Sequence, residues 1–180
     1  MTAHRPSLLR ALRGARREDG GASVEFVLLF PLFVMVFMCS FEASMLLVRQ
    51  VMFDRAVDLA AWDVRMDSRG TGVTQNDLMR NICERTKLIA DCETNVTVEL
   101  SKIDQATYAL PGTTQDCVSH GSGVVPTVGY ETDRNRQLIL LRACVNIDPV
   151  FPGRWLGAKL VSDDGAIKLI TSTAFVVEPG

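Results

Sequence analysis

The side chains of this sequence that could carry out nucleophilic chemistry come closest together at Cys117-Val-Ser-His120. A thiol three residues from an imidazole can form a catalytic pair when a third group orients the histidine. The sequence shows no such group, and Cys117 is one of several cysteines in the part of the chain after Val48. We therefore expect Cys117 to form a disulfide, and we expect the protein not to be an enzyme.

The cysteines that follow Val48 form an even set, which favours disulfides in an exported domain. They are Cys83, Cys92, Cys117 and Cys144. Four cysteines allow three pairings, and we favour the sequential one, in which Cys83 pairs with Cys92 and Cys117 with Cys144. A zinc site is the alternative, but the chain has no CxxC pair. The sequence therefore predicts no metal.

The sequence gives little support to two further kinds of site. Asp163 and Asp164 are neighbouring carboxylates, but the sequence Asp-Asp-Gly is foremost a turn between strands. No glycine-rich loop follows a strand in the manner of a phosphate-binding loop. We therefore expect no bound nucleotide and no other cofactor.

The elements that position these residues are arranged around one apolar run, Val24–Val48. A helix needs about 20 predominantly apolar residues to cross a bilayer, and the range Phe26–Cys39 contains no charged residue. A soluble core helix would show a polar face at the 3.6-residue period, and here none begins before Ser40 and Glu42. The sequence predicts a transmembrane helix over residues 21–48.

Arginines are concentrated before this run, and positive charge marks the cytoplasmic flank of a membrane helix. They are Arg5, Arg10, Arg13, Arg16 and Arg17. We expect residues 1–20 to be a cytoplasmic basic leader and the larger part of the chain to be exported. A cleaved signal peptide is disfavoured, because the run is long and lacks small residues spaced for cleavage. The net charge of -2 gives no electrostatic argument for nucleic-acid binding.

The junction between leader and apolar run has a specific spacing, in which Gly20 is followed by four residues and then by Glu25 and Phe26. This spacing resembles the type IV prepilin cleavage site of the tight-adherence (Tad, or Flp) branch of pili. The resemblance implies that a prepilin peptidase cuts between Gly20 and Gly21, where glycine leaves the backbone unhindered. It also implies that Glu25 neutralises the N-terminal amine of a neighbouring subunit. The simpler alternative is that Glu25 only snorkels to the cytoplasmic interface.

The rest of the pattern predicts an α+β fold. Helical spacing continues past the membrane to about Met66, which gives an amphipathic extension over residues 49–68. A second helix is predicted from near Thr74, a good N-cap residue, to about Ala90. Alternating apolar residues predict strands at 96–101, 138–147 and 167–177, with a short strand near Val124 and Val128 and a short helix over 155–161. Residues 69–180 should thus form a small domain with a helix packed on an antiparallel sheet of three to four strands.

This order of elements is similar to that of the TadE/TadF minor pseudopilins. The resemblance implies a protein that is anchored in the bacterial inner membrane, has its domain in the periplasm, and takes part in assembling a tight-adherence pilus. It does not separate TadE from TadF.

The implied partners are the lipid bilayer, the prepilin peptidase, the inner-membrane assembly platform, and other pseudopilins and the major pilin through the N-terminal helix. No nucleic acid is implied. The alternative is an unprocessed single-pass membrane protein whose periplasmic domain acts as a binding or sensing module.

Overall fold

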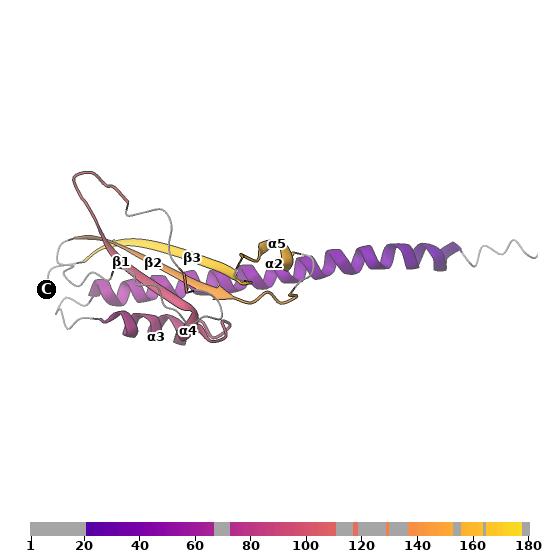
Figure 1. Ribbon diagram of the computed structural model, residues 1–180, viewed down its shortest axis with the longest axis horizontal. Helices are drawn as coiled ribbons and strands as arrows, with labels where there is room; N and C mark the ends of the chain where they lie inside the picture. The colour runs from indigo at the N-terminus through magenta and orange to yellow at the C-terminus, as the bar shows by residue number, and fades with distance from the viewer. Residues whose placement is uncertain are drawn as a thin grey trace, which may run out of the picture. The chain divides into compact units, whose positions relative to one another are not determined.

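The computed structural model describes residues 21–66, 73–110, 117–118, 129, 137–152, 156–163 and 165–177. The chain divides into two compact units, Met1–Ser40 and Phe41–Gly180. The elements shown in Figure 1 are α2 (Gly21–Met66), α3 (Gln75–Arg85), α4 (Cys92–Asn95), β1 (Val96–Ile103), β2 (Leu138–Ile147), α5 (Gly157–Leu160) and β3 (Ile167–Val176).

The described part of the first unit is the N-terminal stretch of α2, and its side chains have almost no partner within the chain. Pro31 lies inside the helix without ending it. The hydroxyl of Ser40 donates to the carbonyl oxygen of Val36 at 2.8 Å, so this polar group is satisfied within the helix. By length and composition α2 could span a membrane, and none of its most apolar window is buried by the rest of the chain.

The second unit contains an antiparallel sheet with the strand order β1-β2-β3. Val96 pairs with Val145 at one end of the β1–β2 ladder, and Ile147 pairs with Ile167 at the same end of the β2–β3 ladder. The central strand β2 is buried along nearly its whole length, as expected for a strand with neighbours on both edges and cover on both faces. The α+β fold is confirmed, with three strands in the described part of the chain.

One hydrophobic core joins the second half of α2, the helix α3 and the sheet. The contribution of α2 follows the helical period, with Phe53, Val57, Ala60 and Val64 all buried. Leu78 and Ile82 of α3 are also fully buried. The amphipathic extension predicted beyond the membrane run is therefore a core helix of the domain, and α2 ends at Met66.

The helix α3 begins where the sequence predicts and ends earlier. Thr74 caps it, and Thr74 and Asp77 form a reciprocal capping box that satisfies backbone N–H groups of the first turn. The predicted end near Ala90 is wrong, because α3 stops at Arg85. The Thr86 hydroxyl donates to the carbonyl oxygen of Ile82 at 2.8 Å, and the chain turns there instead of continuing as a helix.

The remaining predictions differ little from the structure or fall outside the part that it describes. The last two predicted strands correspond to β2 and β3, and the first is extended to Ile103 in β1. The short helix predicted over 155–161 is α5, at Gly157–Leu160. The leader 1–20 and the strand predicted near Val124 and Val128 lie outside the described residues.

Candidate functional site

The predicted processing junction lies at the start of α2. Gly20 is outside the described residues, whereas Gly21 is the first residue of the helix and is exposed. A methyl group at Gly21 would meet nothing within 4 Å, so the structure leaves open space around this position. Glu25 follows four residues later, on the same face of the helix and about one turn away.

Glu25 and Phe26 are both exposed on the surface of α2. The Phe26 ring stacks on that of Phe30 with centroids 5.1 Å apart, which is a contact within the helix. After cleavage at Gly20, the new α-amino group would be about 6 Å along the helix axis from the residue position of Glu25, at 1.5 Å per residue. The geometry thus places Glu25 about one helical turn from the N-terminus that cleavage would create.

Two disulfides join Cys83 to Cys92 and Cys117 to Cys144, the pairs favoured on sequence order. The Cys117 sulfur is therefore not available as a nucleophile, and His120 lies outside the described residues. Cys39, in the apolar stretch of α2, is a free cysteine. Among the residues that the structure describes, no group of His, Cys, Asp and Glu side chains is arranged to hold a metal ion.

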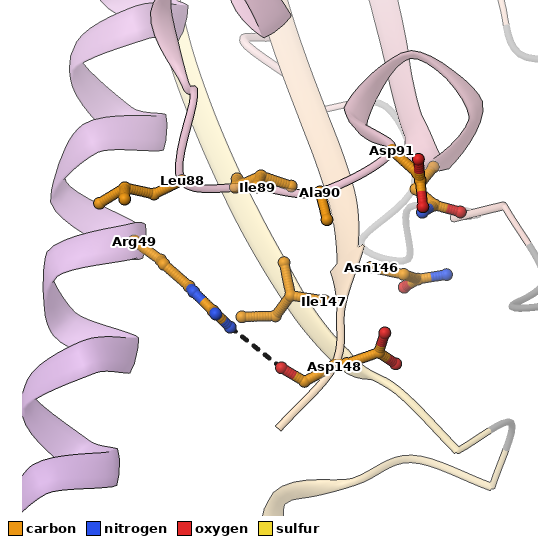
Figure 2. Close-up of a pocket in the computed structure, with 9 residues that line it drawn as sticks. Arg49, Leu88, Ile89, Ala90, Asp91, Asn146, Ile147 and Asp148 are labelled. Atoms are coloured by element: carbon orange, nitrogen blue, oxygen red, sulfur yellow. Dashed lines mark hydrogen bonds between the residues drawn. The ribbon is translucent and has the colours of Figure 1, made fainter. Parts of the chain in front are cut away.

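A small cavity lies between α2, the turn around residues 88–91 and the end of β2 (Figure 2). Arg49 reaches across from α2 and donates to the carbonyl oxygen of Asp148 at 3.0 Å. In Figure 2 the Ile147 side chain points toward the helix, and Asn146 points away from it. The cavity volume of about 140 Å³ is below the roughly 300–1,000 Å³ of ordinary ligand pockets. We assign it no ligand.

The most unusual polar contact of the second unit involves a buried carboxylate on α2. Glu42 is 0% exposed. Its Oε2 accepts a hydrogen bond from the backbone N–H of Gly157 at 2.9 Å, and its Oε1 accepts one from that of Phe151 at 3.3 Å. The residue before α5, Leu156, provides no side-chain cap. Glu42 therefore satisfies an unpaired N–H at the start of α5 from another element of the fold.

The close approach of this carboxylate explains the glycine at position 157. A Cβ there would lie 2.5 Å from Glu42 Oε1, 2.9 Å from the Phe151 carbonyl oxygen and 3.0 Å from Pro149 Cβ. Backbone atoms cannot move away as a flexible side chain can, so only glycine fits. The Phe41 and Phe151 rings also pack here, with centroids 6.3 Å apart. Glu42, Gly157 and the two rings together fasten the chain after β2 to α2.

The sequence prediction missed this contact, although one signal was present. Glu42 stands inside the predicted membrane run 21–48, where a carboxylate is expensive unless it is paired or hydrogen-bonded. That cost indicates a partner, but it does not identify Gly157, which is 115 residues away.

The surface of α2 opposite the core carries exposed apolar side chains at helical spacing. The exposed set is Leu47, Val48, Val51, Leu59, Trp62 and Met66, with Arg55 and Asp58 on the same face. Such a stripe is typical of a helix that packs against a further partner. We refer to these eight residues as the outer stripe.

Comparisons with known proteins give one match. No curated protein and no solved structure matches the chain. The model of the TadE-like protein family matches residues 20–62, a range that begins at the predicted cleavage glycine and includes the apolar stretch and most of α2. Over this range the chain is similar to the TadE-like proteins, which confirms the predicted resemblance and is consistent with a component of the Tad pilus system.

Proposed function

We propose that this protein is a minor pseudopilin, a non-catalytic component that takes part in assembling a tight-adherence pilus. The observation that carries the proposal is the junction. Gly21, Glu25 and Phe26 begin a long, exposed apolar helix, and the TadE-like match starts at Gly20. A prepilin peptidase would cut between Gly20 and Gly21 and leave the helix as the new N-terminus.

The structure of α2 supports a role in assembly through helix packing. Between Phe26 and Cys39 its first part offers only apolar side chains to its surroundings, which suits the lipid bilayer and the helices of other pilin subunits. Its second part holds the domain core on one face and presents the outer stripe on the other. A neighbouring pseudopilin or major pilin would pack along this stripe.

The proposed location is the bacterial inner membrane, with the N-terminus cytoplasmic and the second unit periplasmic. Leader arginines favour this orientation through the positive-inside rule. The two disulfides in the second unit suit an oxidising compartment. The assembly platform of the inner membrane would receive the protein there, and no catalytic role is proposed for Cys117, which is disulfide-bonded.

Cleavage is tested by expressing the chain together with a prepilin peptidase and measuring the intact mass. We expect the wild-type chain to lose residues 1–20 and Gly20→Trp to remain at full length, because a large side chain obstructs the scissile bond. Ser23→Ala, a small change inside the same junction but outside the motif, is the matched control and should be cleaved normally. Normal cleavage of Gly20→Trp would reject the assigned bond.

The alternative function, an unprocessed single-pass protein with a sensing domain, makes the opposite prediction for the same experiment. Its N-terminus would remain at or near Met1 whether or not the peptidase is present. The 140 Å³ cavity beside Arg49 is too small to favour a metabolite sensor. The junction and the apolar helix support the pseudopilin role, whereas this cavity gives the sensing role no support.

A further inference from the structure

An irregular segment of the second unit is hydrogen-bonded to α2 at Glu42, two residues after the end of the first unit in sequence. We call the described residues 148–152 and 156–160 the collar. The first range follows β2 directly, and the second contains the short helix α5. α5 lies beside α2 (Figure 1), where the Gly157 N–H reaches Glu42. At the other end of the collar, the Arg49 guanidinium donates a hydrogen bond to the carbonyl oxygen of Asp148. The collar is thus attached to α2 at two positions, about two turns of helix apart.

The backbone of the collar limits how far the hydrocarbon layer can extend along α2. Lipid-exposed irregular backbone does not occur within hydrocarbon, because its polar groups would have no partners. If α2 spans a membrane, as the proposed function requires, the hydrocarbon must therefore end before the collar begins, near Phe41. The range 21–40 corresponds to roughly 30 Å of helix, which matches the thickness of a bilayer core.

The exposed side chains of the collar are suited to the surface of a bilayer. Phe41 is the apolar residue at which the exposed stretch of α2 meets the collar, and its ring packs on Phe151. Pro152 and Leu160 are exposed, and Lys159 lies exposed next to Leu160. Aromatic and aliphatic groups beside a basic residue are typical of segments that rest at the boundary between headgroups and acyl chains.

We propose that the collar rests on the periplasmic surface of the bilayer and sets the depth at which the protein sits in the membrane. Phe41, Phe151 and Leu160 contact the acyl boundary, and Lys159 faces the phosphates of anionic phospholipids. Glu42 is a positioning residue, since its two hydrogen bonds fix the collar at this level of α2. The proposal ends the membrane span near Phe41 rather than at residue 48, and it rests on the membrane anchoring of the proposed function.

The test compares two labelled positions in the full chain. Leu160→Cys and Val176→Cys are made in a Cys39→Ser background and labelled with a small fluorophore, without reductant so that both disulfides stay intact. The two native side chains are similarly exposed, 45% and 48%. Val176 lies at the opposite end of β3 from Ile167, which is roughly 30 Å at 3.3 Å per residue. Each protein is reconstituted in vesicles of phosphatidylethanolamine and phosphatidylglycerol that contain lipid with a nitroxide near the headgroup.

We expect the label at 160 to be quenched at least two-fold more than the label at 176. Equal weak quenching at both positions, in protein that floats with the vesicles, would overturn the collar proposal and leave the membrane anchor intact. Such a result would instead mean that the collar faces water or a protein partner. Failure to float would remove the anchor, and with it both the proposed function and this inference.

The role of Glu42 is tested by the same measurement. Glu42→Ala removes both acceptor oxygens and should reduce quenching at 160 to near the value at 176, while the disulfide pairs still form. Glu42→Gln keeps one acceptor oxygen and should retain part of the quenching. Full quenching at 160 in a folded Glu42→Ala protein would show that Glu42 does not position the collar. The comparison of positions 160 and 176 in the parent chain does not depend on these variants.

Discussion

At the scale of single residues, the contact between Glu42 and Gly157 makes the most specific demand on the sequence. A buried carboxylate is stable only when its oxygens are hydrogen-bonded, and here two backbone N–H groups supply those bonds. Each partner constrains the other, because the carboxylate occupies the space that a Cβ at position 157 would need. Neither residue can be changed without a consequence for the other.

Gly157→Ala should therefore destabilise the full chain in detergent by about 1–3 kcal/mol, the usual range for overpacking a filled site. The reason is the clash of the new methyl group with Glu42 Oε1 at 2.5 Å and with a backbone oxygen at 2.9 Å. The measurement is the midpoint of chemical denaturation. Ala158→Ser, an exposed neighbour in α5, should stay within about 0.5 kcal/mol of the parent chain. Equal stability of the two variants would contradict the geometry.

Glu42→Ala should lower the free energy of unfolding by about 1–3 kcal/mol, because it leaves the N–H groups of Gly157 and Phe151 unsatisfied. Combined with Gly157→Ala, its effect should be strongly non-additive, because removing the carboxylate also removes the nearest clash. A double-mutant cycle measured by denaturation gives the coupling. Simple addition of the two losses would show that the residues act independently.

At the scale of elements, α3 depends on its N-terminal cap. The hydrogen bond from the Thr74 hydroxyl to the Asp77 carboxylate, at 2.6 Å, and a second from the Thr74 backbone lower the pKa of Asp77 from its ordinary 3.8, with a further contribution from Arg80. A lowered pKa means that the ionised form is preferred in the folded state. The capping box is therefore strongest when Asp77 is charged.

This shift predicts the direction of a pH effect. The stability that Asp77 adds is fully present above pH 3.8 and is lost as the pH falls through the lowered pKa of the folded state. Wild type should exceed Asp77→Asn in denaturation midpoint at pH 6, and the difference should shrink on going to pH 2.5. Thr74→Ala should remove most of the pH dependence that Asp77 causes. A difference that grows in acid would contradict the assigned cap.

The two disulfides close loops of different length. The separations are 9 residues for Cys83–Cys92 and 27 residues for Cys117–Cys144. Loop-closure entropy predicts that replacing Cys83 and Cys92 by serine lowers the free energy of unfolding by roughly 2.5 kcal/mol. The same change at Cys117 and Cys144 should lower it by roughly 3.5 kcal/mol. The difference in the denaturation midpoints of the two double variants checks this order. A greater loss for the shorter loop would mean that local packing outweighs chain entropy.

At the scale of the whole molecule, the helices and strands whose apolar residues recur at a regular spacing could be predicted from the sequence. The contacts between residues far apart in the sequence could not. The limits of α2 and β2 follow from uninterrupted apolar patterns, and the strands from alternation. The predicted end of α3 is wrong because the Thr86 hydroxyl bonds back to Ile82 and its N–H to Cys83, a local capping detail that periodicity does not encode. The cleavage motif is local in sequence and stays a prediction, whereas the Glu42–Gly157 contact depends on the fold.

The central claim is that the apolar helix becomes the N-terminus of a membrane-held protein. It is tested most directly by the intact mass and N-terminal sequence of the protein isolated from membranes of cells that contain a prepilin peptidase. We predict a membrane-bound chain that begins at Gly21 and has both disulfides oxidised. A mature chain that still carries Arg5 to Arg17, or a soluble chain without α2, would contradict the claim.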